Sequence, residues 1–138
     1  MENKILHVED NPDDVMLTRM AFRRAGVSAE LEVACDGDQA LTLLKGSTSP
    51  PVCVLLDIKL PSMSGLDILA WIRQQPLLKR LPTIMLTSSV LADDINRAYD
   101  LGANSYLLKP TDPDGLVEIA QLIDRYWLRL NTRPVLAP

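Results

Sequence analysis

Short apolar segments alternate with longer segments of helical spacing along most of the chain. A short apolar run bounded by turn residues is typical of a strand, whereas apolar positions three and four residues apart are typical of a helix. The apolar segments fall near residues 4–9, 30–35, 52–57, 82–87 and 104–108, and a helical segment follows each one. Five strand–helix units in succession predict an α/β fold, in which a five-stranded parallel sheet lies between two layers of helices.

Residues that favour helix starts and ends support these boundaries. Asn11-Pro12 and Asp112-Pro113 each combine an N-cap residue with proline at the first helical position. Ser64 and Asp67 have the spacing of a capping box, in which each side chain accepts a hydrogen bond from the other residue's backbone. Three glycines stand where helices are expected to end: Gly26, Gly46 and Gly102.

The chain length limits the number of domains. A chain of 138 residues is long enough for one well-buried domain and too short for two ordinary ones. We expect the domain to span residues 1–131 and residues 132–138 to form a short C-terminal tail, with no output domain. Residues 47–51 form the other segment that resembles a linker.

Composition and charge narrow the class of protein. Hydrophobic residues make up 47% and charged residues 23% of the chain, as in soluble globular proteins. The longest apolar run, residues 52–56, is far shorter than the ~20 residues that a membrane span needs. The N-terminus lacks the features of a signal peptide. Together these observations predict a cytoplasmic location. The net charge of −4 argues against direct binding to nucleic acid. Cys35 and Cys53 are expected to be buried thiols, because neither belongs to a CxxC motif or has a histidine beside it.

Polar residues stand at the carboxyl ends of four of the predicted strands. Glu9 and Asp10 close the first strand and Asp57 closes the third, while Thr87 and Lys109 end the fourth and fifth. In a doubly wound, flavodoxin-like sheet of order 2-1-3-4-5, the first and third strands are adjacent, and ligands bind at the carboxyl edge of the sheet. We therefore expect these five side chains to converge on one crevice.

The three carboxylates in this crevice predict a cation and phosphoryl chemistry. Two such charges about 4 Å apart, at an effective dielectric of about 20, repel by ~4 kcal/mol. Mg²⁺ relieves this repulsion, because it takes one or two carboxylates and leaves positions for water and phosphate oxygens. With the metal bound, Asp57 could attack phosphorus in line and form an aspartyl phosphate. Lys109 and Thr87 could then meet the new charge. A cis bond before Pro110 could direct the lysine inward.

Four polar residues near these positions have simpler explanations. Asp13 and Asp14 lie in the first turn of the first predicted helix, where acidic side chains interact favourably with the helix dipole. His7 lies in the middle of a central strand and is expected to be a packed core histidine rather than a ligand or phosphodonor. Ser88 is either close to the phosphate or a solvated loop hydroxyl.

Four motifs lie in order along the chain: Ile5 to Asn11 (ILHVEDN), Leu55 to Pro61 (LLDIKLP) with Ser64-Gly65, Met85 to Ser88 (MLTS), and Gly102-Ala103 through Tyr106 to Lys109-Pro110. Together they resemble the receiver domains of two-component response regulators, which are related to the chemotaxis receiver protein. The resemblance covers about residues 4–130. It implies a signalling protein that accepts a phosphoryl group from a histidine kinase and catalyses only its own phosphorylation and dephosphorylation.

The resemblance also implies roles for the acidic residues. Asp57 is the implied phosphoacceptor. By the same resemblance, Mg²⁺ is expected to be bound by Asp10, by Asp57 and by the backbone carbonyl of Lys59, with Glu9 binding it through water.

The remaining implied roles concern the phosphoryl group and its readout. The resemblance implies that Thr87 and Lys109 contact the phosphoryl group. It also implies that Tyr106 is the switch aromatic, whose inward turn would repack the face formed by the fourth helix, fifth strand and fifth helix. The opening EDNPDD, residues 9–14, looks most like the small regulators paired with cyanobacterial and bacterial phytochromes, which implies a phytochrome as the kinase partner.

The last predicted helix has more apolar residues than one buried face requires. A core-facing stripe is expected at helical spacing, formed by Leu116, Ile119, Ala120, Ile123, Tyr126, Trp127 and Leu130. Val117, Leu122 and Leu128 lie off that stripe and predict a homodimer face on this helix, with the fourth helix as a further candidate for the same face. Ordinary surface positions are the alternative explanation for these residues.

Two other functions compete with the signalling switch. A receiver-like adaptor that never cycles phosphate would lack some of the site residues, and none is missing here. A magnesium-dependent hydrolase of the haloacid dehalogenase type would have a second aspartate two residues after the nucleophile, where this chain has Lys59. The sequence therefore favours the switch.

Overall fold

A single parallel sheet forms the centre of the computed structural model, which describes residues 3–46 and 49–136. Its strand order is β2-β1-β3-β4-β5, which confirms the predicted topology. Each strand lies within its predicted segment and differs from it by at most one residue at either end. The strands are β1 (Lys4–Val8), β2 (Glu30–Ala34), β3 (Cys53–Leu56), β4 (Thr83–Thr87) and β5 (Ser105–Leu108).

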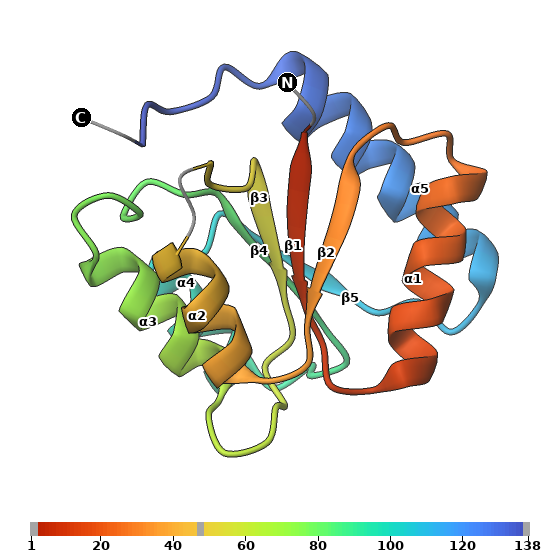
Figure 1. The fold of residues 1–138 in the computed structure, drawn as a ribbon. Coiled ribbons are helices and arrows are strands. Elements are labelled where there is room, and N and C mark those ends of the chain that lie inside the picture. The colour runs from red at the N-terminus through yellow and green to blue at the C-terminus, as the bar shows by residue number, and fades with distance from the viewer. Residues whose placement is uncertain (1–2, 47–48, 137–138) are drawn as a thin grey trace.

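Helices cover both faces of the sheet (Figure 1). On one face, α1 packs against α5, and α5 continues into a π-helical segment, η1. On the other face, α3 lies between α2 and α4 and contacts both. The helices are α1 (Pro12–Arg24), α2 (Gly37–Gly46), α3 (Gly65–Gln74), α4 (Ala92–Asp100), α5 (Pro113–Ile123) and η1 (Asp124–Leu130).

The sheet separates two hydrophobic clusters, because successive side chains of a strand point to opposite faces. On β1, Leu6 and Val8 belong to the cluster that includes residues of α2, α3 and α4, whereas Ile5 packs with residues of α1 and α5. All four residues of β3 are buried and contribute to both clusters, as predicted for a central strand. His7 is only 2% exposed, so its predicted position in the core is confirmed.

The predicted helix caps are present. The Asn11 side chain accepts hydrogen bonds from the backbone N–H groups of Asp13 (2.9 Å) and Asp14 (3.3 Å) at the start of α1. Asp112 caps α5 in the same way, and Ser64 forms both bonds of the predicted capping box of α3. These caps fix the first turns of the helices that begin beside the carboxyl edge of the sheet.

The predicted buried stripe of the last helix is only partly correct beyond Ile123, where Trp127 packs against the core as predicted. Tyr126 and Leu130 are exposed, whereas Leu128, which was predicted to lie off the stripe, packs against the core. The cause is η1: a π-helix has more residues per turn than an α-helix, so positions chosen with α-helical spacing rotate away from the core.

The prediction of two buried thiols is half correct. Cys53 is buried in β3, and burial raises the pKa of its thiol to about 12. Cys35 is exposed, because β2 ends one residue earlier and Cys35 begins the following turn. Its backbone N–H donates to the side chain of Gln39 (2.8 Å).

The described part of the C-terminal segment lies along the amino ends of the strands. Arg133 donates a hydrogen bond to the side chain of Asn3 (3.1 Å), and Leu136 packs against a core cluster. Residues 1–2 lie outside the described residues, as do residues 47–48 of the predicted linker at 47–51 and residues 137–138 of the predicted tail at 132–138. Among the residues that are described, no helix has both the length and the apolar character that a membrane crossing requires.

Candidate functional site

The carboxyl edge of the sheet brings together the three acidic residues predicted to converge. Glu9 and Asp10 follow β1, and Asp57 follows β3. These strands are neighbours, with Val8 paired to Leu56, so the residues after them meet. One carboxylate oxygen from each acidic residue can be chosen so that all three lie within 4.8 Å of one another.

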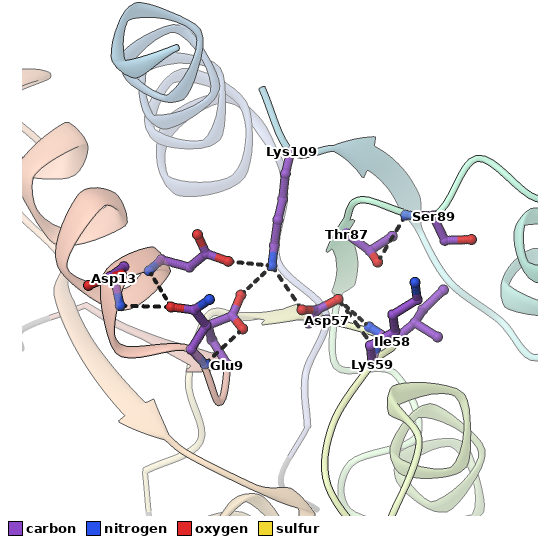
Figure 2. Close-up of polar contacts among 10 residues, drawn as sticks. Glu9, Asp13, Asp57, Ile58, Lys59, Thr87, Ser89 and Lys109 are labelled. Carbon is purple, nitrogen blue, oxygen red and sulfur yellow. Dashed lines mark hydrogen bonds and ion pairs between the residues drawn. The ribbon is translucent and has the colours of Figure 1, made fainter. Parts of the chain in front are cut away.

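Lys109 reaches this acidic cluster from the end of β5. Its Nζ lies 2.8 Å from Asp57 Oδ2, 2.5 Å from Glu9 Oε1 and 3.0 Å from Asp14 Oδ2 (Figure 2). Burial alone would lower the pKa of Lys109, but its hydrogen bonds to Asp57, Glu9 and Asp14 outweigh burial and raise that pKa above its usual value. The lysine is therefore a cation held by three carboxylates.

The predicted cis bond before Pro110 is wrong, because the residues that the structure describes contain no cis peptide. The Lys109 side chain reaches the carboxylates from a trans backbone, since β5 already ends at the same edge of the sheet. No special peptide geometry is needed to direct it inward.

Backbone groups fix the Asp57 carboxylate on its other side. Oδ1 of Asp57 accepts hydrogen bonds from the backbone N–H groups of Ile58 (2.7 Å) and Lys59 (3.4 Å). Gly65 allows this loop to fold closely, since a Cβ at Gly65 would lie 1.9 Å from the backbone oxygen of Asp57. The Asp57 side chain is only 8% exposed, so these bonds orient a carboxylate that is almost fully buried.

Glu9 is the most deeply buried member of the cluster, at 1% exposure. Burial raises the pKa of Glu9, and the bonds from Lys109 oppose that rise. Its second oxygen accepts a hydrogen bond from the backbone N–H of Asn11 (3.2 Å). Asp10, in contrast, is exposed on the loop between β1 and α1.

Asp14 belongs to the site, which sequence reasoning missed. It lies in the first turn of α1, as predicted, but its carboxylate also accepts a hydrogen bond from Lys109. Asp13, its neighbour in the same turn, is exposed and has no cationic partner among the described residues. Two adjacent aspartates look equivalent in sequence, so only the direction of each side chain distinguishes them.

Thr87 is connected to Tyr106 and α4 through Ser89. The backbone N–H of Ser89 donates to Thr87 Oγ1 (3.4 Å), and its hydroxyl donates to Asp94 in the first turn of α4 (2.6 Å). The hydroxyl of Tyr106 donates to the backbone oxygen of Ser89 (2.9 Å). Figure 2 shows Thr87 and Lys109 on different sides of Asp57. Ser88 is exposed, as a solvated loop hydroxyl would be.

The donor set of the acidic cluster fits a hard divalent cation. Glu9, Asp10 and Asp57 supply only oxygen ligands, and Asp10 is open to solvent. Hard cations such as Mg²⁺ prefer carboxylate, carbonyl and water oxygens. The edge therefore combines a candidate cation site, a fixed carboxylate and an ammonium group within one small space.

Comparisons with known proteins agree with this arrangement. The family model of the response regulator receiver domain matches residues 5–121. A probable methanogenesis regulatory protein, FilR2 of Methanothrix harundinacea, is 40% identical over 94% of this chain and 86% of that protein. Response regulator Rcp1 of Synechocystis is 36% identical over 94% of this chain and 92% of Rcp1.

Solved structures extend the comparison to the fold. The structure of the phosphorylated cyanobacterial phytochrome response regulator RcpA has a TM-score of 0.89 and 35% identity, and the match covers 97% of this chain and 99% of that one. The Mn²⁺-bound form of Rcp1 has a TM-score of 0.85 and 34% identity over 96% of this chain and 99% of that one. The chain belongs to the response regulator receiver domain family of two-component signalling proteins, and phytochrome response regulators are among its relatives.

Proposed function

We propose that this protein is a phosphorelay switch that accepts a phosphoryl group from a histidine kinase on Asp57. The observation that carries the proposal is the position of the Asp57 carboxylate, which belongs to the acidic cluster and also contacts the Lys109 ammonium. Of the residues in the cluster, Asp57 alone is fixed by two backbone N–H groups and by a lysine at once.

The proposed metal is Mg²⁺, bound by Asp10, Asp57 and the backbone carbonyl of Lys59, with Glu9 acting through water. When bound, Mg²⁺ would offset the charge of the carboxylates and of the incoming phosphoryl oxygens. The oxygen-only donor set supports this choice, and the relative Rcp1 has been solved with Mn²⁺ bound.

In the proposed transfer, a carboxylate oxygen of Asp57 attacks the phosphorus of a phosphohistidine. A P–O bond forms while the P–N bond breaks, and the imidazole of the kinase leaves. Lys109 donates to a phosphoryl oxygen, and the Thr87 hydroxyl donates to another. Lys109 already contacts Asp57, and Thr87 ends the strand next to the one that Asp57 follows, so both groups come from the same edge of the sheet.

We propose that Tyr106 then reports the phosphoryl group to the face formed by α4, β5 and α5. The contacts of Ser89 support this path, because they join Thr87, Tyr106 and the first turn of α4. When Thr87 moves toward the phosphoryl group, these bonds are placed to carry the shift into α4. The output is a change in binding to another protein rather than to nucleic acid.

The proposed donor is a kinase of the phytochrome type, because relatives with 34–36% identity are named phytochrome response regulators or Rcp1. A homodimer through α5 and η1 is also proposed. Of its suggested face, Leu122 is exposed, whereas Val117 and Leu128 are half-buried. Leu122 is therefore the residue on which the dimer proposal now depends.

Incubation with acetyl phosphate and Mg²⁺, read by intact mass, tests the phosphoacceptor. The unmutated chain should gain one phosphoryl group, and Asp57→Asn should gain none. Chelation of the metal should prevent the gain. A phosphoryl group on both chains, or on neither, would contradict the proposal. The adaptor that never cycles phosphate predicts the second of these results.

A further inference from the structure

The three carboxylates that bind Lys109 are not equivalent. Glu9 and Asp57 belong to the acidic cluster that fits a cation, and Asp14 does not. A dication in the cluster would repel the ammonium and would draw on the oxygens of Glu9 and Asp57. Asp14 is then the one carboxylate partner of Lys109 that the cation does not share.

We propose that Asp14 is the counter-ion that Lys109 keeps when a divalent cation occupies the acidic cluster. This rests on the proposed function, and it makes Asp14 a positioning residue that acts through Lys109. Asp14 accepts a hydrogen bond from one N–H of the Lys109 ammonium, so its negative charge offsets the repulsion between the lysine and a dication bound in the acidic cluster. The other two N–H groups of the ammonium then remain available to donate to phosphoryl oxygens.

The structure fixes Asp14 well enough for this role. Its backbone N–H donates to the side chain of Asn11, so it lies on a capped first turn, and its Oδ2 lies 3.0 Å from Lys109 Nζ. Asp14 is 35% exposed and Lys109 is 19% exposed, so water screens the pair partly. A moderate effect is therefore expected rather than a large one.

Asp13 provides a matched control. It carries the same charge, lies in the same turn of α1 and is bound at its backbone N–H by the same Asn11 side chain. Removing its charge changes the field near the site without touching Lys109. Any difference between Asp14→Asn and Asp13→Asn therefore reports the contact with the lysine.

Titration with Mg²⁺ alone, followed by the backbone amide signals of Ile58 and Lys59 in NMR spectra, tests the proposal. Asp14→Asn should weaken Mg²⁺ binding by about three- to fivefold, the size expected of a partly screened ion pair, and Asp13→Asn by less than about twofold. The difference should disappear when both changes are made in a Lys109→Gln background.

The outcomes separate the two proposals. If the unmutated protein binds Mg²⁺ and the two aspartate variants behave alike, the role of Asp14 is overturned and the proposed function stands. The role of Asp14 is also overturned if Asp14→Asn and Asp13→Asn still differ in Mg²⁺ affinity in the Lys109→Gln background. If the unmutated protein shows no Mg²⁺ response at Ile58 and Lys59, the proposed function fails and this inference fails with it.

Discussion

At the carboxyl edge of the sheet, the negative charges of several carboxylates are offset by the positive charge of one lysine. One ammonium, that of Lys109, contacts three carboxylates, and two of these, Glu9 and Asp57, are almost fully buried. A buried carboxylate without a partner would be costly. Removing the charge of Lys109 should therefore lower the stability of the folded protein and disturb the proposed chemistry. Asp14 is the more informative residue to change by itself, and Lys109→Gln serves as a background for comparing the Asp14 and Asp13 variants.

His7 should remain neutral well below the usual pKa of a histidine. Burial, and then the nearby charge of Lys109, lower the pKa of His7 from 6.5 to about 4. The chain has a single histidine, so an NMR titration of its imidazole is unambiguous. An apparent pKa near 6.5 in the folded protein would contradict the structure.

The same shift predicts how stability depends on pH. Because the folded pKa is depressed, the unfolded chain binds the proton more tightly. The contribution of neutral His7 is then complete above pH 6.5 and is lost as the pH falls toward 4, by about 3 kcal/mol at pH 4. Urea unfolding at several pH values should show this loss, and His7→Val should show less of it between pH 6.5 and 4.

Several site residues could be predicted from sequence because they follow recognisable strands. The strand pattern and the sheet order were enough to predict that Glu9, Asp10 and Asp57 lie close together. Asp14 could not be found in this way, since its role depends on the direction of one side chain. The bonds made by Ser89 were missed for the same reason.

Among the elements, the loop from β3 to α3 determines where Asp57 sits. Gly65 begins α3, and its backbone N–H donates to the backbone oxygen of Ile58 (2.9 Å). A side chain at Gly65 would meet the backbone of Asp57, which cannot move aside as a flexible side chain could. The position of the Asp57 backbone therefore depends on the position of the first residue of α3.

Gly65→Ala should lower the rate of phosphorylation by acetyl phosphate by about tenfold to 100-fold, because it displaces the Asp57 backbone. Gly46→Ala is the matched control, since a Cβ there has nothing within 4 Å. The rate for Gly46→Ala should stay close to that of the unmutated chain. If Gly65→Ala is phosphorylated at the same rate as the unmutated chain, the close approach of Gly65 to the Asp57 backbone does not constrain the site.

Element types followed from hydrophobic spacing, and the exception is η1. All five strands and the five α-helices fall where the periodicity and caps predicted them. The π-helical turns of η1 could not be predicted, because the analysis of Tyr126 and Leu130 assumed α-helical spacing. The error assigned to the core two residues that lie at the surface.

At the scale of the whole molecule, the sheet places the phosphoryl chemistry and the proposed dimer face on different parts of the surface. The chemistry lies at the carboxyl edge, whereas Leu122 lies on α5, beyond the capped first turn. Communication between them must pass through packed elements. The contacts from Thr87 through Ser89 to α4 are one such route.

The homodimer proposal can be tested with two leucines of equal exposure. Leu122 is 55% exposed on α5, and Leu77 is 56% exposed in the segment that follows α3. Light scattering should give a dimer mass for the unmutated chain and for Leu77→Glu, and a monomer mass for Leu122→Glu, because a buried charge disrupts an apolar contact. A monomer mass for the unmutated chain, with and without a phosphoryl analogue, would refute the dimer.

The most direct test of the central claim is a crystal structure of the protein with Mg²⁺ and beryllium fluoride, which mimics a phosphoryl group. The account predicts the analogue bonded to a carboxylate oxygen of Asp57, contacted by Lys109 and Thr87, with the metal on Asp10, Asp57 and the carbonyl of Lys59. Binding of the analogue at another residue, or a metal bound away from these three groups, would contradict it.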